Sequence, residues 1–181
     1  MLDVLQEALV EKTRLKNGRK AQPTAGILDS QSVTSTLVSS ESKGFDAGKK
    51  IKGIKRHIIV DTLGLVLAIV IQSASVQDRD GAGEVIRQMQ QIYRQVTLLF
   101  ADGGYRGKLI AWVKSMFKIR LKIVKRHEKH TFQVLPKRWV VERTFAWIDA
   151  HRRNAKNYER FNDTSIAMVQ VASIRIMLNR F

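Results

Sequence analysis

Three acidic residues have types and positions that could support chemistry on a phosphodiester. Asp29 lies within a run of isoleucine, leucine and small polar residues, Asp102 follows the apolar segment 96–101 and precedes two glycines, and Glu142 lies between basic residues on a predicted helix. Taken singly, each is equally typical of a turn, a strand end or a helix surface. Together, carboxylates that are far apart in sequence but converge in space are the ligands that a pair of divalent metal ions requires. The three acids therefore predict a site for Mg²⁺ or Mn²⁺.

Alternating and apolar runs define the elements that must position these acids. A helical stripe begins near Asp80 and separates the third predicted strand from the fourth, so the fourth strand is able to pair in parallel. The unbroken apolar run 65–71 predicts a central strand, and 61–64 predicts a tight hairpin turn. The order predicts an α/β fold, a ribonuclease H-like mixed sheet with helices on both faces. Strands are expected at 26–33, 52–60, 65–71, 96–101 and 119–124, and helices from about 80, at 108–116, at about 137–153 and from 162–164 onward.

The two ends of the chain give further expectations. Residues 1–22 are interpreted as a short helical remnant and a basic linker, and residues 23–181 as the catalytic domain. The last helix carries an apolar stripe at helical spacing. Its members are Ala167, Val171, Ile174, Leu178 and Phe181.

Positive charge is the most informative bulk property. Lysine and arginine number 32 against 16 acids, a net charge of +16, and basic residues cluster in 43–56 and 114–129. Such an excess attracts polyanions, nucleic acid first among them, through contacts to phosphate that do not read sequence. The residues expected to bind DNA are Lys49, Lys50, Lys52, Lys55, Arg56, Lys125, Arg126, Arg138, Arg152 and Arg153.

Other classes of site receive little support. There is no cysteine for a disulfide or a thiolate metal site, and the longest apolar run is too short to cross a bilayer, so we expect no membrane contact and a cytoplasmic, nucleoid-associated protein. No histidine pair has a convincing zinc spacing; these residues are His57, His127, His130 and His151. Three tryptophans could stack on bases, but their helical positions are more typical of a core. They are Trp112, Trp139 and Trp147.

Five segments in sequence order resemble insertion-sequence DDE transposases of the "insertion sequence five" group: ILDSQSV, DAGKKIKGIKRHIIVDTLGL, VQDRDGA, LLFADGGYRG and LPKRWVVERTFAW. The resemblance implies a ribonuclease H-like fold and three metal-binding acids, which map onto Asp29, Asp102 and Glu142. It also implies DNA cleavage and strand transfer on transposon ends and target DNA, and it allows a homodimer on DNA.

The chain departs from the family pattern in three places. Arg138 stands four residues before Glu142 as expected, but the family's tyrosine position is Leu135 and its later basic position is Asp149. Arg152 or Arg153 could supply that missing charge. Only about 28 residues precede Asp29, so the chain is interpreted as a frameshift product or a truncated copy with impaired end recognition.

Two alternatives stay open at this point. A non-enzymatic basic nucleic-acid-binding protein explains the charge equally well, but it does not explain the three acids. A ribonuclease H-like nuclease without strand transfer explains both features.

Overall fold

The computed structural model describes residues 1–39, 42–124 and 138–180 of the chain. In this described part, one six-stranded sheet has the order β2-β3-β1-β5-β6, and β4 pairs with β3. β1 is antiparallel to β3, whereas β5 is parallel to both β1 and β6, so the predicted mixed sheet is confirmed. The strands are β1 (Ala25–Thr34), β2 (Gly44–Asp46), β3 (Ile51–Asp61), β4 (Val66–Ser73), β5 (Leu98–Ala101) and β6 (Arg120–Ile123).

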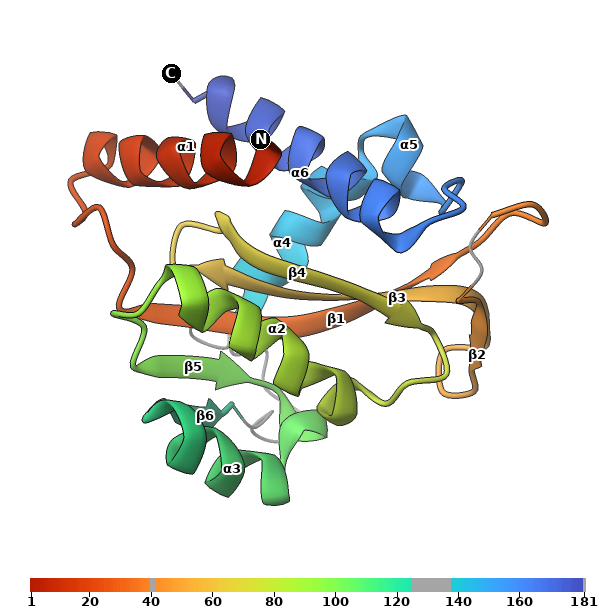
Figure 1. Cartoon of the computed structure of the whole chain (residues 1–181), viewed down its shortest axis with the longest axis horizontal. Helices are drawn as coiled ribbons and strands as arrows, with labels where there is room; N and C mark the ends of the chain where they lie inside the picture. The colour runs from red at the N-terminus through yellow and green to blue at the C-terminus, as the bar shows by residue number, and fades with distance from the viewer. Residues whose placement is uncertain (40–41, 125–137, 181) are drawn as a thin grey trace, which may run out of the picture.

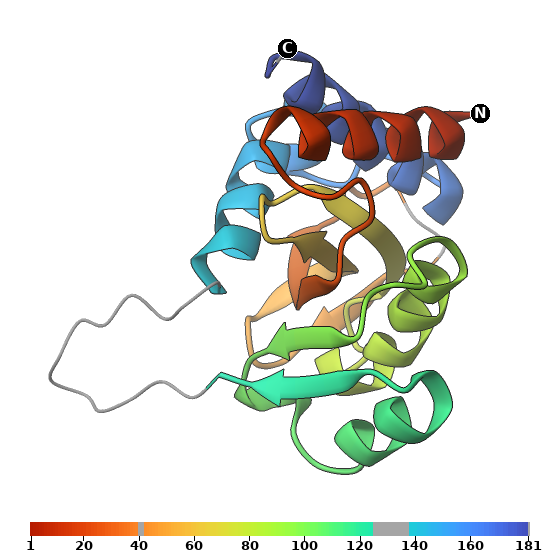
Figure 2. The same ribbon diagram turned by 90° about the vertical axis from the view of Figure 1, so that its left-hand side faces the viewer.

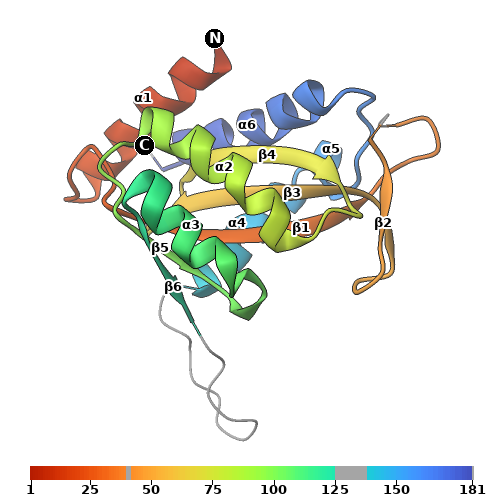
Figure 3. The same ribbon diagram turned by 60° about the horizontal axis from the view of Figure 1, so that its bottom comes forward.

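Helices cover both faces of the sheet, as expected. Figures 1 and 2 show α2 and α3 on one face, α4 on the other, and α1 beside α6 above the β4 edge. Figure 3 shows the short β2 at the end of β3 farthest from the β3–β4 hairpin. The helices are α1 (Leu2–Lys16), α2 (Asp78–Ile92), α3 (Lys108–Phe117), α4 (Arg138–Asp149), α5 (Arg152–Ala155) and α6 (Asn162–Leu178), with a 3-10 turn at Gly103–Tyr105.

Alternation along the strands divides the core into two clusters. On β1, Leu28 packs in the cluster beneath α2, whereas Ile27 packs in the cluster beneath α4. Residues one position apart on a strand point to opposite faces, and residues two apart share a face. The sheet face on which a β1 or β5 side chain lies therefore follows from whether it is an even or an odd number of positions from Ile27 or Phe100.

The hairpin between β3 and β4 forms as predicted. Asp61 Oδ1 accepts hydrogen bonds from the N–H groups of Leu63 and Leu65, both at 2.9 Å. Gly64 takes a φ of 85°, a conformation that favours glycine because it has no Cβ. The Asp-Thr-Leu-Gly sequence thus fixes the turn from both ends.

The prediction that residues 65–71 form a central strand is wrong. β4 pairs with β3 and lies at the edge of the sheet, and its apolar residues are buried because α2, α6 and α1 pack against it. Two side-chain amides bond to its backbone: Gln6 donates to the Val66 carbonyl at 2.9 Å and Asn162 to the Ile71 carbonyl at 3.2 Å. Covering an edge in this way satisfies groups that would otherwise invite pairing with another strand.

Residues 1–22 are not a separate appendage in the structure. α1 packs along α6, with Leu9 and Val10 buried in the cluster beneath α2. Arg14 forms a buried ion pair with Asp61 at the hairpin. This packing could not be predicted from the sequence because the partner helix lies at the other end of the chain.

Two helix predictions also require correction. The helix expected over 137–153 ends at Asp149, and α5 begins at Arg152 after a break. The predicted stripe on α6 is only partly the buried face, since Ile174 is buried but Val171 and Leu178 are 45% and 53% exposed. Phe181 lies outside the described residues. α6 instead packs on two partners, α1 and the sheet, through Val169, Ala172, Ile174 and Met177.

Candidate active site

Asp29 and Asp102 lie side by side on neighbouring parallel strands. Ile27 of β1 is in register with Phe100 of β5. Asp29 comes two positions after Ile27, and Asp102 comes two positions after Phe100. Both acids are partly exposed. Oδ1 of Asp29 accepts a hydrogen bond from the Ser30 N–H, and Oδ1 of Asp102 accepts one from the Gly104 N–H, each at 2.8 Å. The fourth predicted strand, β5, thus pairs in parallel as the sequence allowed, and its partner is β1.

Both carboxylates lie on the face of the sheet that α4 covers. Ile27 and Phe100 belong to the cluster beneath α4. Because side chains two residues apart share a face, Asp29 points the same way as Ile27, and Asp102, just past the end of β5, continues the Phe100 side.

Glu142 extends from the helix that covers this same face. Val141, Phe145 and Ile148 of α4 are buried against the sheet, whereas Glu142 is exposed. Seven residues, about 10 Å of helix, separate Glu142 from Asp149 on the same stripe. Asp149 accepts a hydrogen bond from Gln31, two positions beyond Asp29 on β1, so the stripe faces the two strand acids.

No three acidic or histidine side chains of the described residues lie close enough to hold one metal ion. Convergence of all three carboxylates on one metal pair therefore stays a prediction. The donors that are present still fit a hard divalent cation, because Asp29 and Asp102 offer carboxylate oxygens from adjacent strand ends and a cation would offset the repulsion between them.

Tyr105 lies behind the two strand acids and was not singled out from the sequence. It is 1% exposed, and burial followed by the negative charge of Asp29 raises its pKa well above the usual value, with Asp78 and Asp102 acting in the same direction. The segment ADGGY could have indicated this position, because Tyr105 is only three residues after Asp102. The 3-10 turn between them keeps the tyrosine near the two acids.

Arg56 does not lie on the surface, contrary to its predicted role as a DNA ligand. It is 2% exposed, and its guanidinium lies 3.2 Å from Asp149 Oδ1 and donates to the Asn154 carbonyl at 2.8 Å. Asp149 had no role carried over from the family pattern. The structure gives it one: it joins α4 to β3 and, through Gln31, to β1.

Lys55 requires the same correction. It is 4% exposed, lies 2.8 Å from Asp78 and 3.3 Å from Asp46, and donates to the Val76 carbonyl at 2.7 Å. Burial alone would raise the pKa of Asp46, but hydrogen bonds from Ser32 and from the Lys49 N–H, with the charge of Lys55, lower it to about 2. Lys55 therefore ties α2 and β2 to the sheet instead of meeting phosphate.

The other basic residues divide into exposed and undescribed groups. Lys49 and Lys50 are exposed at the turn before β3, and Lys52 is exposed near the start of β3. Lys49 Nζ lies 3.5 Å from the Ser30 carbonyl, next to Asp29. Arg152 and Arg153 are exposed, and Arg153 pairs with Glu159. Four predicted positions lie outside the described residues or have undescribed side chains: Lys125, Arg126, Leu135 and Arg138.

The described histidines and tryptophans differ in their surroundings. His57 is fully buried, and burial lowers its pKa to about 4. His151 Nδ1 lies 2.9 Å from the Trp147 carbonyl, whereas His127 and His130 lie outside the described residues. Trp139 is 45% exposed, so the expectation of a core position is wrong for this tryptophan.

Within the described ranges, no helix is long and apolar enough to cross a membrane.

Comparisons with known proteins agree with this architecture. The family model described as the transposase DDE domain matches residues 20–177. The "Putative transposase for insertion sequence element IS402" of Burkholderia cepacia is 29% identical over 134 residues, which cover 70% of this chain and 64% of that protein. The chain thus spans less than two thirds of this curated relative.

Solved structures with similar folds include two catalytic domains. The catalytic core domain of BIV integrase matches with a TM-score of 0.54 at 12% identity, over 86% of this chain and 94% of that one. The catalytic domain of Mos1 mariner transposase matches with a TM-score of 0.47 at 8% identity, over 97% and 87% of the two chains. The integrase match supports the ribonuclease H-like fold, and the family model covers most of the sequence: this chain belongs to the DDE transposase domain family.

Proposed function

We propose that the chain cleaves DNA and joins the cut strand to target DNA in the transposition of an insertion sequence. Asp29, Asp102 and Glu142 are the residues that hold Mg²⁺ or Mn²⁺. The observation that carries the proposal is the pairing of β1 with β5, which sets two carboxylates side by side on the face that α4 covers.

The residues of the chain have distinct roles in this reaction. Bound divalent ions supply the activation of the attacking oxygen and the stabilisation of the leaving oxygen. Asp29 and Asp102 present their carboxylates from rigid strand ends, and backbone N–H groups fix one oxygen of each. Glu142 approaches from α4, whose far end is held against β3 by Arg56 and Asp149.

The substrate side of the proposal is a DNA backbone, at transposon ends and at the target. Lys49 lies beside the carbonyl of Ser30, so its ammonium is available to a phosphate next to Asp29. The relative named for an insertion sequence supports the transposon as the source of that DNA. A homodimer on DNA is part of the same proposal, since joining two ends to one target requires two active sites.

Nicking of supercoiled plasmid tests the catalytic assignment. We expect the chain to nick plasmid with Mg²⁺ or Mn²⁺ and not with chelator, and we expect Asp102→Asn to be inactive while its fold and DNA affinity persist. Asp163→Asn is the matched control, because Asp163 is an exposed acid at the start of α6. Equal nicking by wild type and Asp102→Asn would overturn the assignment.

A joining assay separates the alternatives. A labelled oligonucleotide with a free 3′ hydroxyl becomes covalently attached to plasmid only if the chain performs strand transfer. Cleavage without joining would indicate a nuclease, and DNA binding without either activity would indicate a non-enzymatic nucleic-acid-binding protein.

A further inference from the structure

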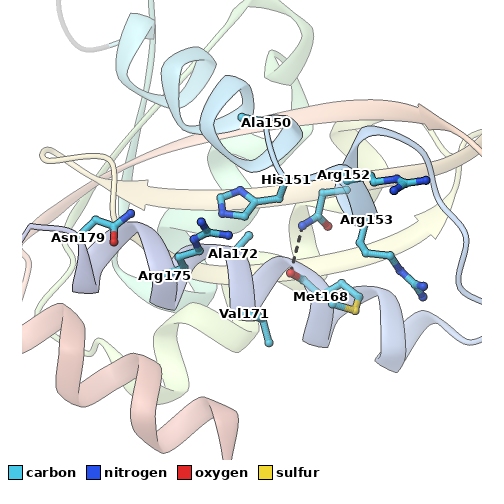
Figure 4. Close-up of a pocket in the computed structure, with 10 residues that line it drawn as sticks. Ala150, His151, Arg152, Arg153, Met168, Val171, Ala172, Arg175 and Asn179 are labelled. Carbon is cyan, nitrogen blue, oxygen red and sulfur yellow. Dashed lines mark hydrogen bonds between the residues drawn. The ribbon is translucent and has the colours of Figure 1, made fainter.

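A cavity of about 500 Å³ opens between the α4–α5 corner and α6, away from the three acids. Figure 4 shows His151, Arg175 and Asn179 close together on its wall, with Arg152 and Arg153 extending from α5. None of the described residues that line it is acidic. Its polar lining consists of His151, Arg152, Arg153, Asn154, Arg175 and Asn179.

A second group of cations lies on α4 and just after the end of α6. The guanidinium of Arg143 lies 4.4 Å from the ring centroid of Trp139 and 4.3 Å from that of Trp147. Arg180 lies 4.8 Å from the centroid of the same Trp147 ring. Trp147 connects the two groups, because its carbonyl lies 2.9 Å from His151 Nδ1 on the cavity wall.

Among the arginines of these two groups, Arg153 is paired with Glu159. Within the described part of the chain, Arg143, Arg175 and Arg180 form no ion pair. Burial and then the positive charge of Arg143 lower the pKa of Arg180 below its usual value. Asp61 attracts Arg180, but its carboxylate is already paired with Arg14. Like charges gathered without a counter-ion are stabilised when an anion binds among them.

We propose that Arg143, Arg175 and Arg180, with His151, form a phosphate track that holds the DNA backbone as it leaves the active site. The track starts at Arg143, one residue after Glu142, and reaches the cavity at Ala150, just past the end of α4 and about 10 Å further along the helix axis. That length passes several phosphates of a duplex, which carries one negative charge for about every 1.7 Å of its axis. Planar guanidinium groups suit phosphate oxygens, and two of the three are held in place by tryptophan rings. The choice of DNA as the polyanion rests on the proposed function.

The salt dependence of DNA binding tests the track without requiring cleavage. Binding to an unrelated duplex is measured across a salt series with chelator present. Each lost phosphate contact lowers the slope of log K against log salt by about 0.9. We therefore expect Arg175→Gln to reduce the slope by about 0.9, and Arg175→Gln combined with Arg180→Gln to reduce it by about 1.8. Arg175→Lys keeps the charge and restores most of the slope.

The control removes the same charge from the other side of the sheet. Arg87→Gln with Arg94→Gln changes two exposed arginines at the end of α2, and we expect the wild-type slope. Equal slopes for the wild type and the Arg175→Gln/Arg180→Gln variant, or equal losses in the track and control variants, would overturn the proposal. If the chain does not nick plasmid but the track variants alone lose slope, the catalytic function is rejected and the phosphate track is supported. If the chain nicks plasmid but the track variants keep the wild-type slope, the phosphate track is rejected and the catalytic function is supported.

Discussion

Replacing Arg14 with methionine removes one partner of the buried ion pair that joins α1 to the β3–β4 hairpin. The side chains of Arg14 and Asp61 are 7% and 0% exposed. Arg14 Nε also donates to the carbonyls of Lys20 and Ala21, at 2.9 and 3.1 Å, so the same side chain fixes the segment after α1. Methionine keeps most of the apolar stem and loses the charge.

The expected cost is large because Asp61 stays buried without its counter-charge. Breaking a buried pair by removing one partner costs about 3–5 kcal/mol. For a domain of this size, that corresponds to a fall in melting temperature of roughly 6–20 °C. Asp61→Asn in the same protein removes the orphaned charge, while its side-chain oxygen still accepts from the Leu63 and Leu65 N–H groups. The double variant is therefore expected to recover part of the loss.

Urea unfolding of the wild type, both single variants and the double variant gives the coupling energy directly. Arg19→Met is the control, since Arg19 is exposed and its replacement is expected to change stability by less than about 0.5 kcal/mol. A cost below 1 kcal/mol for Arg14→Met, or strict additivity in the double variant, would refute the conclusion that α1 is integral to the domain.

Three further predictions concern the sheet and its covering helices. A Cβ at Gly81 would lie 2.3 Å from the His57 ring, so Gly81→Ala is expected to lower the free energy of unfolding by about 1–3 kcal/mol. The control Gly83→Ala, whose Cβ first meets Trp112 at 3.3 Å, is expected to stay within about 1 kcal/mol of wild type in the same urea series. Because the folded-state pKa of His57 is about 4 against 6.5 unfolded, its contribution is complete above pH 6.5 and is lost as pH falls toward 4. His57→Gln is expected to remove a slope of up to about 1.4 kcal/mol per pH unit, and an unchanged slope would contradict this. Asp149→Ala leaves Arg56 buried without its carboxylate and is expected to cost about 1–3 kcal/mol, less than a fully buried pair because Asp149 is 35% exposed. Plasmid nicking by Asp149→Ala is expected to fall, while the salt slope of its DNA binding stays constant. A loss of both nicking and slope would argue against a role of Asp149 in positioning α4.

Local signals were sufficient for the part of the fold that sets the acids side by side. The Asp-Thr-Leu-Gly turn defines a hairpin through bonds within four residues of Asp61. The helix before β5 makes parallel pairing possible, and the pairing then brings Asp102 beside Asp29. These inferences needed only contacts between residues close in sequence and the rule that parallel strands are joined by a crossover connection.

Burial of charge could not be predicted in the same way. Lys55 and Arg56 lie in a basic run that is typical of a surface. Lys55 has one acidic partner nearby in the sequence, Asp46, but the other partners of the two residues, Asp78 and Asp149, lie 23 and 93 residues later. A sequence window shows the charges but not the tertiary contacts that neutralise them. β4 illustrates the same limit. An apolar run indicates that a strand is buried, but it does not indicate whether neighbouring strands or packed helices bury it.

The acid at position 149 becomes understandable when it is considered together with Arg56. A basic residue at that position would bring a second positive charge to the partly buried contact between α4 and β3, where the Asp149 carboxylate now lies 3.2 Å from Arg56. Two unit charges of the same sign about 4 Å apart, at an effective dielectric constant of about 20, repel each other by about 4 kcal/mol. Asp149→Lys alone is therefore expected to displace the end of α4, whereas Asp149→Lys with Arg56→Glu is expected to restore the contact with its charges exchanged. Because α4 also carries Glu142, nicking by the exchanged pair would measure whether this contact sets the position of the third acid.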